Sequence, residues 1–232
     1  MEAAIGDVSR SSRVARDLGR GLSGLTATKV AGYTRQPGEE DVVRWYHLIM
    51  TAYGFWLPND PRGSWSDFVG AWELRKFGPA TKTSEKRSLA HDPHDRALRL
   101  AAKQALKYPV VRFIEAQRNA IGEGFGQAIS EGGYRAHALC IGHDHSHSVI
   151  ERHGRSIEQI ATHLKSKATM ALTRANLHPL ARFRKNDGSV PTPWSVGIWS
   201  VFINDEEQLR NAIAYVERHP GKEGLAPQEY PA

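Results

Sequence analysis

The segment His143-Asp144-His145-Ser146-His147 places histidines at every second position of a short stretch of the chain. Alternate side chains of a β-strand point to the same face, so these imidazoles would lie side by side if the segment is extended. Residues 135–141 before it and 148–151 after it are both typical of strands, and Gly142 with its polar neighbours could turn the chain between them. The sequence thus predicts a β-hairpin with imidazoles crowded near the start of its second strand.

Crowded imidazoles have two interpretations. Protonated rings this close would repel one another, so a bound divalent cation would organise them. The alternative is a polar turn at a strand end that binds nothing. The strand by itself leaves both open, and a ligand from a distant part of the chain would decide between them.

The composition is that of a globular protein with an excess of positive charge. Of the 232 residues, 40% are hydrophobic and 24% are charged, and the formal net charge is +6. Such a charge suits a polyanionic partner. Cys140 is the sole cysteine, which excludes a disulfide within the chain. No apolar run approaches the about 20 residues that span a bilayer, and no secretory signal is recognisable. We therefore expect a cytoplasmic protein without a membrane segment.

The order of the expected elements indicates the fold class. Residues 1–40 are rich in Gly, Ser, Arg and Ala and are expected to form a flexible tail. The remaining patterns predict a strand over 45–53, helices over 95–107 and 110–121, the hairpin, a helix over 156–176, a strand over 198–203, and a helix from 205 to about 218 that Pro220 and Gly221 stop. This is the split βαβ order of a ferredoxin-like antiparallel sheet, an α+β fold, with one further helix behind it.

The last helix supplies the distant ligand. Tyr215 and His219 are four residues apart and therefore share a helix face. If that face packs against the hairpin, His145, His147 and His219 could hold one cation with Tyr215 beside it. A phenolate in that position could attack a phosphodiester and form a covalent phosphotyrosine, with the metal polarising the phosphate. Spacing alone also allows Tyr215 to be a half-buried aromatic packed on the sheet.

Several motifs, in order, resemble those of single-tyrosine HUH transposases of the REP-associated and insertion-sequence types. His145-Ser146-His147 is similar to the histidine–hydrophobic–histidine motif of that family. The resemblance runs from about Val42 to Gln228, and the other stretches that carry it are YHLIMTAYGFWLPNDPRG (46–63), LKSKAT (164–169), WSVFI (199–203) and YVERHPGKEGL (215–225).

This resemblance implies an enzyme that cuts and rejoins single-stranded, hairpin-forming DNA through a 5′-phosphotyrosine, with Mg²⁺ or Mn²⁺ as cofactor. By position, Tyr215 becomes the nucleophile and His145 and His147 the metal ligands. His219 falls where the family usually has a polar side chain, often Asn or Gln, that can complete the metal site. The catalytic domain would span residues 41–228, between the tail 1–40 and a short C-terminal tail 229–232, and would act as a monomer or a homodimer.

The chain departs from the family pattern at two positions. Ser146 stands where a bulky apolar residue is usual, and His143 stands where proline is common, so His143 and His145 form an alternative pair of ligands. Three imidazoles are softer ligands than the oxygens that Mg²⁺ prefers, which favours Mn²⁺. The candidate DNA contacts, which combine phosphate-binding cations with a base-stacking ring, are Lys165, Lys167, Arg174, Trp56 and Arg62.

Two other functions remain open. One is a domesticated protein of the same fold that binds hairpin DNA but no longer cuts it. The other is a metal hydrolase of a different family, which would need acidic ligands. Asp144 is the one acidic residue near the histidines in sequence, and strand alternation would point it to the opposite face. The hydrolase is therefore the least favoured of the three.

Overall fold

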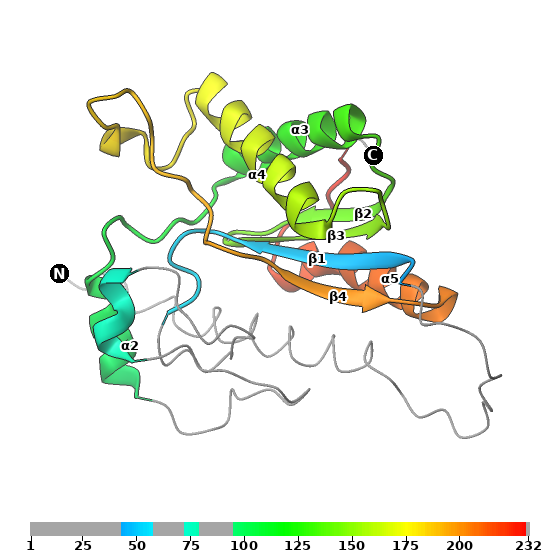
Figure 1. Ribbon diagram of the computed structural model, residues 1–232, viewed down its shortest axis with the longest axis horizontal. Helices are drawn as coiled ribbons and strands as arrows, with labels where there is room; N and C mark the ends of the chain where they lie inside the picture. The colour runs from blue at the N-terminus through cyan, green and yellow to red at the C-terminus, as the bar shows by residue number, and fades with distance from the viewer. Residues whose placement is uncertain (1–42, 58–71, 79–94, 231–232) are drawn as a thin grey trace. The chain divides into compact units, whose positions relative to one another are not determined.

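The computed structural model describes residues 43–57, 72–78 and 95–230 (Figure 1). These residues fall into two compact units, one with 57, 72–78 and 95–105 and the other with 43–56 and 106–230. The first unit contains the 3₁₀-helix η1 (Trp72–Phe77) and helix α2 (Arg96–Gln104). The side chain of Asp95 caps α2 by accepting a hydrogen bond of 2.8 Å from the backbone N of Leu98. The predicted tail 1–40 lies outside the described residues.

The second unit is built on a four-stranded sheet in the order β2-β3-β1-β4. Its strands are β1 (Trp45–Thr51), β2 (Ala136–Ile141), β3 (His145–Glu151) and β4 (Trp199–Ile203). All neighbouring strands are antiparallel. With helices between β1 and β2 and between β3 and β4, this order is that of a ferredoxin-like sheet. The predicted α+β fold is confirmed.

Helices cover both faces of the sheet (Figure 1). Helices α3 (Glu115–Gly132) and α4 (Ile157–Arg174) pack together on one face, and α5 (Glu206–Lys222) lies on the other. The hydrophobic core fills the α3/α4 side with large buried side chains, among them Leu48, Met50, Phe125, Ile150 and Leu164. Because side chains alternate along a strand, the opposite face of β1 and β3 presents its histidines to α5.

Helix α3 begins and ends later than the predicted 110–121. Residues before it are extended, and Val111 N donates a hydrogen bond of 3.0 Å to Tyr53 O. The helix then continues through several glycines, although each costs about 1 kcal/mol in a helix. Gly124 is required by packing, because a Cβ there would lie 2.6 Å from Cα of Ala168 in α4. Close contact between the two helices outweighs the low helix propensity.

Helix α5 runs through Pro220, so the predicted stop at that residue was wrong. Proline in the last turn removes a single backbone donor, and the helix ends only at Lys222. Gly224 then adopts the left-handed region, with φ of 71°, and Leu225 N donates to Pro220 O at 2.9 Å. This arrangement is the Schellman motif of helix ends. Because the helix continues, Glu223 lies one helical turn after His219 on the same side of α5.

The chain after α5 crosses the edge strand β2 toward α3. The side-chain amide of Gln228 accepts a hydrogen bond of 2.9 Å from Ile141 N and donates one of 2.8 Å to Ile141 O. The ring of Tyr230 fills the space left by Gly122 of α3. These contacts hold the end of α5 against the sheet. No helix in the described part of the chain is long and apolar enough to span a membrane.

Candidate metal centre

Three histidines from two elements converge between the sheet and α5. His145 and His147 lie on β3 and His219 lies on α5, and all three are almost fully buried. One ring nitrogen from each lies within 4.8 Å of the others. The Nε2 atoms of His145 and His219 are 2.8 Å apart. The structure thus brings together the three residues that the sequence grouped, and they could hold a metal ion.

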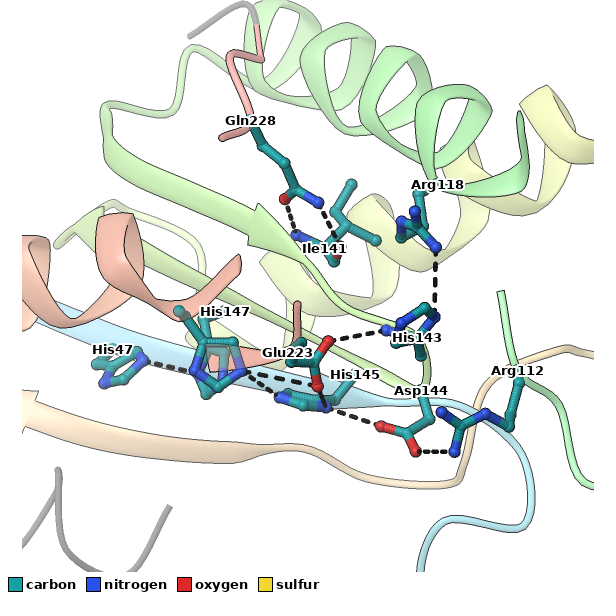
Figure 2. Close-up of polar contacts among 11 residues, drawn as sticks. His47, Arg112, Arg118, Ile141, His143, Asp144, His145, His147, Glu223 and Gln228 are labelled. Atoms are coloured by element: carbon teal, nitrogen blue, oxygen red, sulfur yellow. Dashed lines mark hydrogen bonds and ion pairs between the residues drawn. The ribbon is translucent and has the colours of Figure 1, made fainter. Parts of the chain in front are cut away.

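The Nδ1 atoms of the two β3 histidines face away from this convergence point (Figure 2). Nδ1 of His145 lies 2.9 Å from Oδ1 of Asp144, and Nδ1 of His147 lies 3.0 Å from Nε2 of His47 on β1. Partners of this kind fix the ring orientation and tautomer of metal-binding histidines. They leave Nε2 of both rings for a ligand, and Nε2 of His147 has no hydrogen-bond partner among the described residues.

Burial keeps the imidazoles of His47, His147 and His219 neutral. It lowers the pKa of His47 to about 4 and is the main cause of the shift in the pKa of His219 to about 2, to which the neighbouring His145 adds. The pKa of His147 is likewise held well below its usual value, chiefly by burial and then by His219. A neutral ring keeps a nitrogen lone pair that a metal can accept. Three converging imidazoles, of which His147 and His219 each have a buried nitrogen without a hydrogen-bond partner among the described residues, fit a divalent cation.

Two carboxylates border the histidines. Asp144 was expected to point to the opposite face, and that prediction was wrong. It precedes the first residue of β3, so strand alternation does not govern it, and its carboxylate contacts His145 while also lying 3.6 Å from the guanidinium of Arg112. Glu223 approaches from the end of α5, with Oε1 3.7 Å from Nδ1 of His145. Asp144, His145 and Glu223 form a second group that could hold a metal ion.

His143 lies apart from the convergence point. Its Nδ1 is 3.4 Å from the guanidinium of Arg118 on α3, and it belongs to neither group of possible metal ligands among the described residues. The alternative pairing of His143 with His145 therefore finds no support in the geometry.

Tyr215 lies one turn before His219 on α5, against the histidines. Its ring centroid is 5.5 Å from those of both His147 and His219, and 5.7 Å from that of His47. The ammonium of Lys222 lies 4.6 Å from the centroid of the same ring. The side chain of Tyr215 is buried, with 5% of its surface exposed. The tyrosine that the sequence predicts as the nucleophile thus lies next to the candidate metal centre.

The residues predicted to contact DNA have varied surroundings. Lys165 donates hydrogen bonds to Ser195 O and Gly197 O, and burial lowers its pKa to about 8. Lys167 forms an ion pair of 2.7 Å with Glu131. Arg174 is exposed in the last turn of α4, and the Trp56 ring lies 6.2 Å from that of Trp199. Arg62 lies outside the described residues. DNA contact by all five stays a prediction.

His47, Asp144 and Glu223 were not recognised from the sequence as parts of the site. His47 could have been found from register, because it occupies the same face of β1 as Thr51, which pairs with His145. Glu223 required knowledge that α5 continues past Pro220.

Comparisons with known proteins give little further information. No family model and no curated protein matches the chain. Among solved structures, a REP-associated tyrosine transposase bound to a REP hairpin is similar over 86% of this chain and 76% of that one, with a TM-score of 0.43 and 9% sequence identity. This similarity is too low to establish a common family or function. The fold assignment rests on the sheet order itself.

Proposed function

We propose that the protein is a metal-dependent nuclease and strand transferase for single-stranded, hairpin-forming DNA, with Tyr215 as its nucleophile. The observation that carries this proposal is the contact of the Tyr215 ring with His147 and His219, two of the three converging histidines. The motifs that resemble HUH transposases support the same assignment.

The roles of the residues follow from this arrangement. His145, His147 and His219 would hold Mg²⁺ or Mn²⁺, which when bound polarises the phosphate and stabilises the departing oxygen. The phenolic oxygen of Tyr215 attacks phosphorus, and the O–P bond forms as the bond from phosphorus to the 3′ oxygen breaks. In net terms the phenolic proton moves to the 3′ oxygen. The 5′ end stays on the tyrosine as a phosphodiester, so a 3′ hydroxyl can reverse the reaction and rejoin the strand.

Lys222 has a role in this scheme. Its ammonium lies close to the Tyr215 ring. A positive charge at that distance stabilises the negative charge that the phenol acquires during attack, and the effect is stronger where water is largely excluded.

The burial of the site sets a requirement. Tyr215 is 5% exposed and His145 and His147 are fully buried, so DNA reaches them only after the chain over them moves. The same burial favours the second candidate function, a hairpin-binding protein of this fold that does not cut DNA.

Covalent capture tests both candidates. The full chain is mixed with a pool of single-stranded, hairpin-forming DNA in Mn²⁺, Mg²⁺ or EDTA, and protein–DNA adducts are sought on a denaturing gel. We expect a metal-dependent adduct that Tyr215→Phe abolishes. Tyr108→Phe, which changes a tyrosine packed on Tyr53 and Phe183, serves as the control and should retain it. DNA binding without an adduct in any metal would support the non-cutting candidate.

A further inference from the structure

Glu223 is a buried carboxylate with one oxygen that accepts no hydrogen bond from the described residues. Its side chain is 3% exposed. Oε2 accepts a hydrogen bond of 3.1 Å from His143 N. Oε1 lies 3.7 Å from Nδ1 of His145 and 4.0 Å from Nε2 of His219, beyond hydrogen-bonding distance of both. One oxygen is therefore anchored, while the other faces the histidines (Figure 2).

The backbone at Gly142 is shaped to receive this carboxylate. A Cβ at Gly142 would overlap the carboxylate oxygens of Glu223. Glycine in the turn before β3 thus allows the end of α5 to reach the histidines. Since the atoms in the way belong to the end of a side chain, an alanine at this position would displace the carboxylate and leave the backbone in place.

The carboxylate of Glu223 has no hydrogen-bonded cationic partner among the described residues, and the ring nitrogens nearest to it belong to His145 and His219. A buried carboxylate is costly unless a cation compensates it. Burial lowers the pKa of His147 and of His219, so these two imidazoles are neutral, and the neighbouring Asp144 adds a second negative charge that Arg112 approaches at 3.6 Å. A divalent cation at the histidines would supply the missing charge.

We propose that Glu223 is a further protein ligand of the metal centre. Its Oε1, which lies 3.7 Å from Nδ1 of His145 and 4.0 Å from Nε2 of His219, would turn toward the Nε2 atoms of the three histidines when a metal binds. This inference rests on the metal site of the proposed function and deepens it. A carboxylate oxygen is a good ligand for hard cations such as Mn²⁺ and Mg²⁺. A site made of imidazoles alone would bind Zn²⁺ at least as well as Mn²⁺. Glu223 therefore contributes more to the binding of Mn²⁺ than to that of Zn²⁺.

Metal affinities of the full chain test this assignment. Mn²⁺ binding is measured by electron paramagnetic resonance and Zn²⁺ binding by competition with a chelating dye. We expect Glu223→Gln, which keeps the acceptor for His143 N, to weaken Mn²⁺ binding by at least about tenfold and Zn²⁺ binding by less. Gly142→Ala should have the same effect by displacing the carboxylate. Gly154→Ala, where a Cβ meets no atom within 4 Å, is the control and should bind both metals normally.

The outcomes separate this inference from the proposed metal site. If His145→Ala binds Mn²⁺ as tightly as the unaltered chain, the metal site itself is wrong. If His145→Ala loses Mn²⁺ while Glu223→Gln and Gly142→Ala keep it, only the role of Glu223 is overturned. Infrared difference spectra of the unaltered chain give a result that does not depend on how variants fold. Addition of Mn²⁺ should shift a carboxylate stretching band, and a spectrum without such a shift would contradict the proposal.

Discussion

Nε2 of His47 lies 3.0 Å from Nδ1 of His147, so a pair of buried imidazoles links β1 to β3 on the face that α5 covers. One of the two must donate the proton between them. If His147 donates it, its Nε2 is left with a lone pair directed toward His145 and His219. His47 thus acts through His147, although it belongs to neither group of possible metal ligands.

Replacement of His47 should weaken the metal centre without removing a ligand. We expect His47→Ala to lower Mn²⁺ affinity by about 10- to 100-fold, because His147 loses the partner that orients its ring. Equilibrium binding followed by electron paramagnetic resonance measures this change. His178→Ala also removes a buried histidine, but one that lies between α4 and η2 (Ala181–Phe183), and should leave the affinity unchanged. Equal losses in both variants would show a general effect on folding instead.

Acid should destabilise the metal-free protein. Burial lowers the pKa of His47 to about 4, below the roughly 6.5 of an unfolded chain. Between these values the unfolded state binds a proton that the folded state does not, so the free energy of unfolding falls as pH falls. His47 alone should account for a loss of roughly 3 kcal/mol between pH 6.5 and pH 4. Urea denaturation in EDTA across this range measures how the free energy of unfolding depends on pH, and the dependence should be smaller in His47→Ala than in the unaltered chain. The same dependence in both proteins would mean that His47 is not its source.

Bound metal should stabilise the fold through the same histidines. A ligand present at 100 times its dissociation constant raises the free energy of unfolding by about 2.7 kcal/mol when it binds the folded state alone. We expect Mn²⁺ at that ratio to give this increase in the unaltered chain. His219→Ala removes the ligand on α5 and should abolish it, whereas His178→Ala should show the full increase. Thermal or urea denaturation with and without Mn²⁺ measures this increase. If Mn²⁺ stabilises His219→Ala as much as the unaltered chain, His219 is not a ligand.

The fold was predictable because its main signals are local. Alternation in the hairpin placed His145 and His147 on one face, and the four-residue spacing on the last helix added His219. These patterns depend on backbone geometry alone, so they can be recognised in the sequence without knowledge of the neighbouring elements. The order of strands and helices then indicated the ferredoxin-like sheet.

The missed features depend on contacts between elements. Asp144 lies just outside β3, where alternation no longer applies, and its direction is set by His145 and Arg112. Glu223 belongs to the site only because α5 continues past Pro220 and because Gly142 leaves room for it. Helix α3 extends beyond its predicted end at residue 121 through glycines that have low helix propensity, and the packing that favours them there is with α4.

The contact of α3 with α4 predicts that Gly124→Ala lowers the free energy of unfolding, whereas helix propensity alone would predict an increase. Alanine normally stabilises a helix by about 1 kcal/mol relative to glycine. At Gly124, however, a Cβ would lie 2.7 Å from both Ala168 N and Lys167 O, and these backbone atoms cannot rotate away. Such overpacking typically costs about 1–3 kcal/mol.

We therefore expect Gly124→Ala to lower the free energy of unfolding by about 1–3 kcal/mol, measured by urea denaturation. Gly154→Ala, at a position open to solvent, should leave that free energy unchanged or slightly raise it, because alanine restricts the unfolded chain. A Gly124→Ala protein more stable than the unaltered chain would mean that the two helices separate easily. The glycines of α3 would then need an explanation other than close packing.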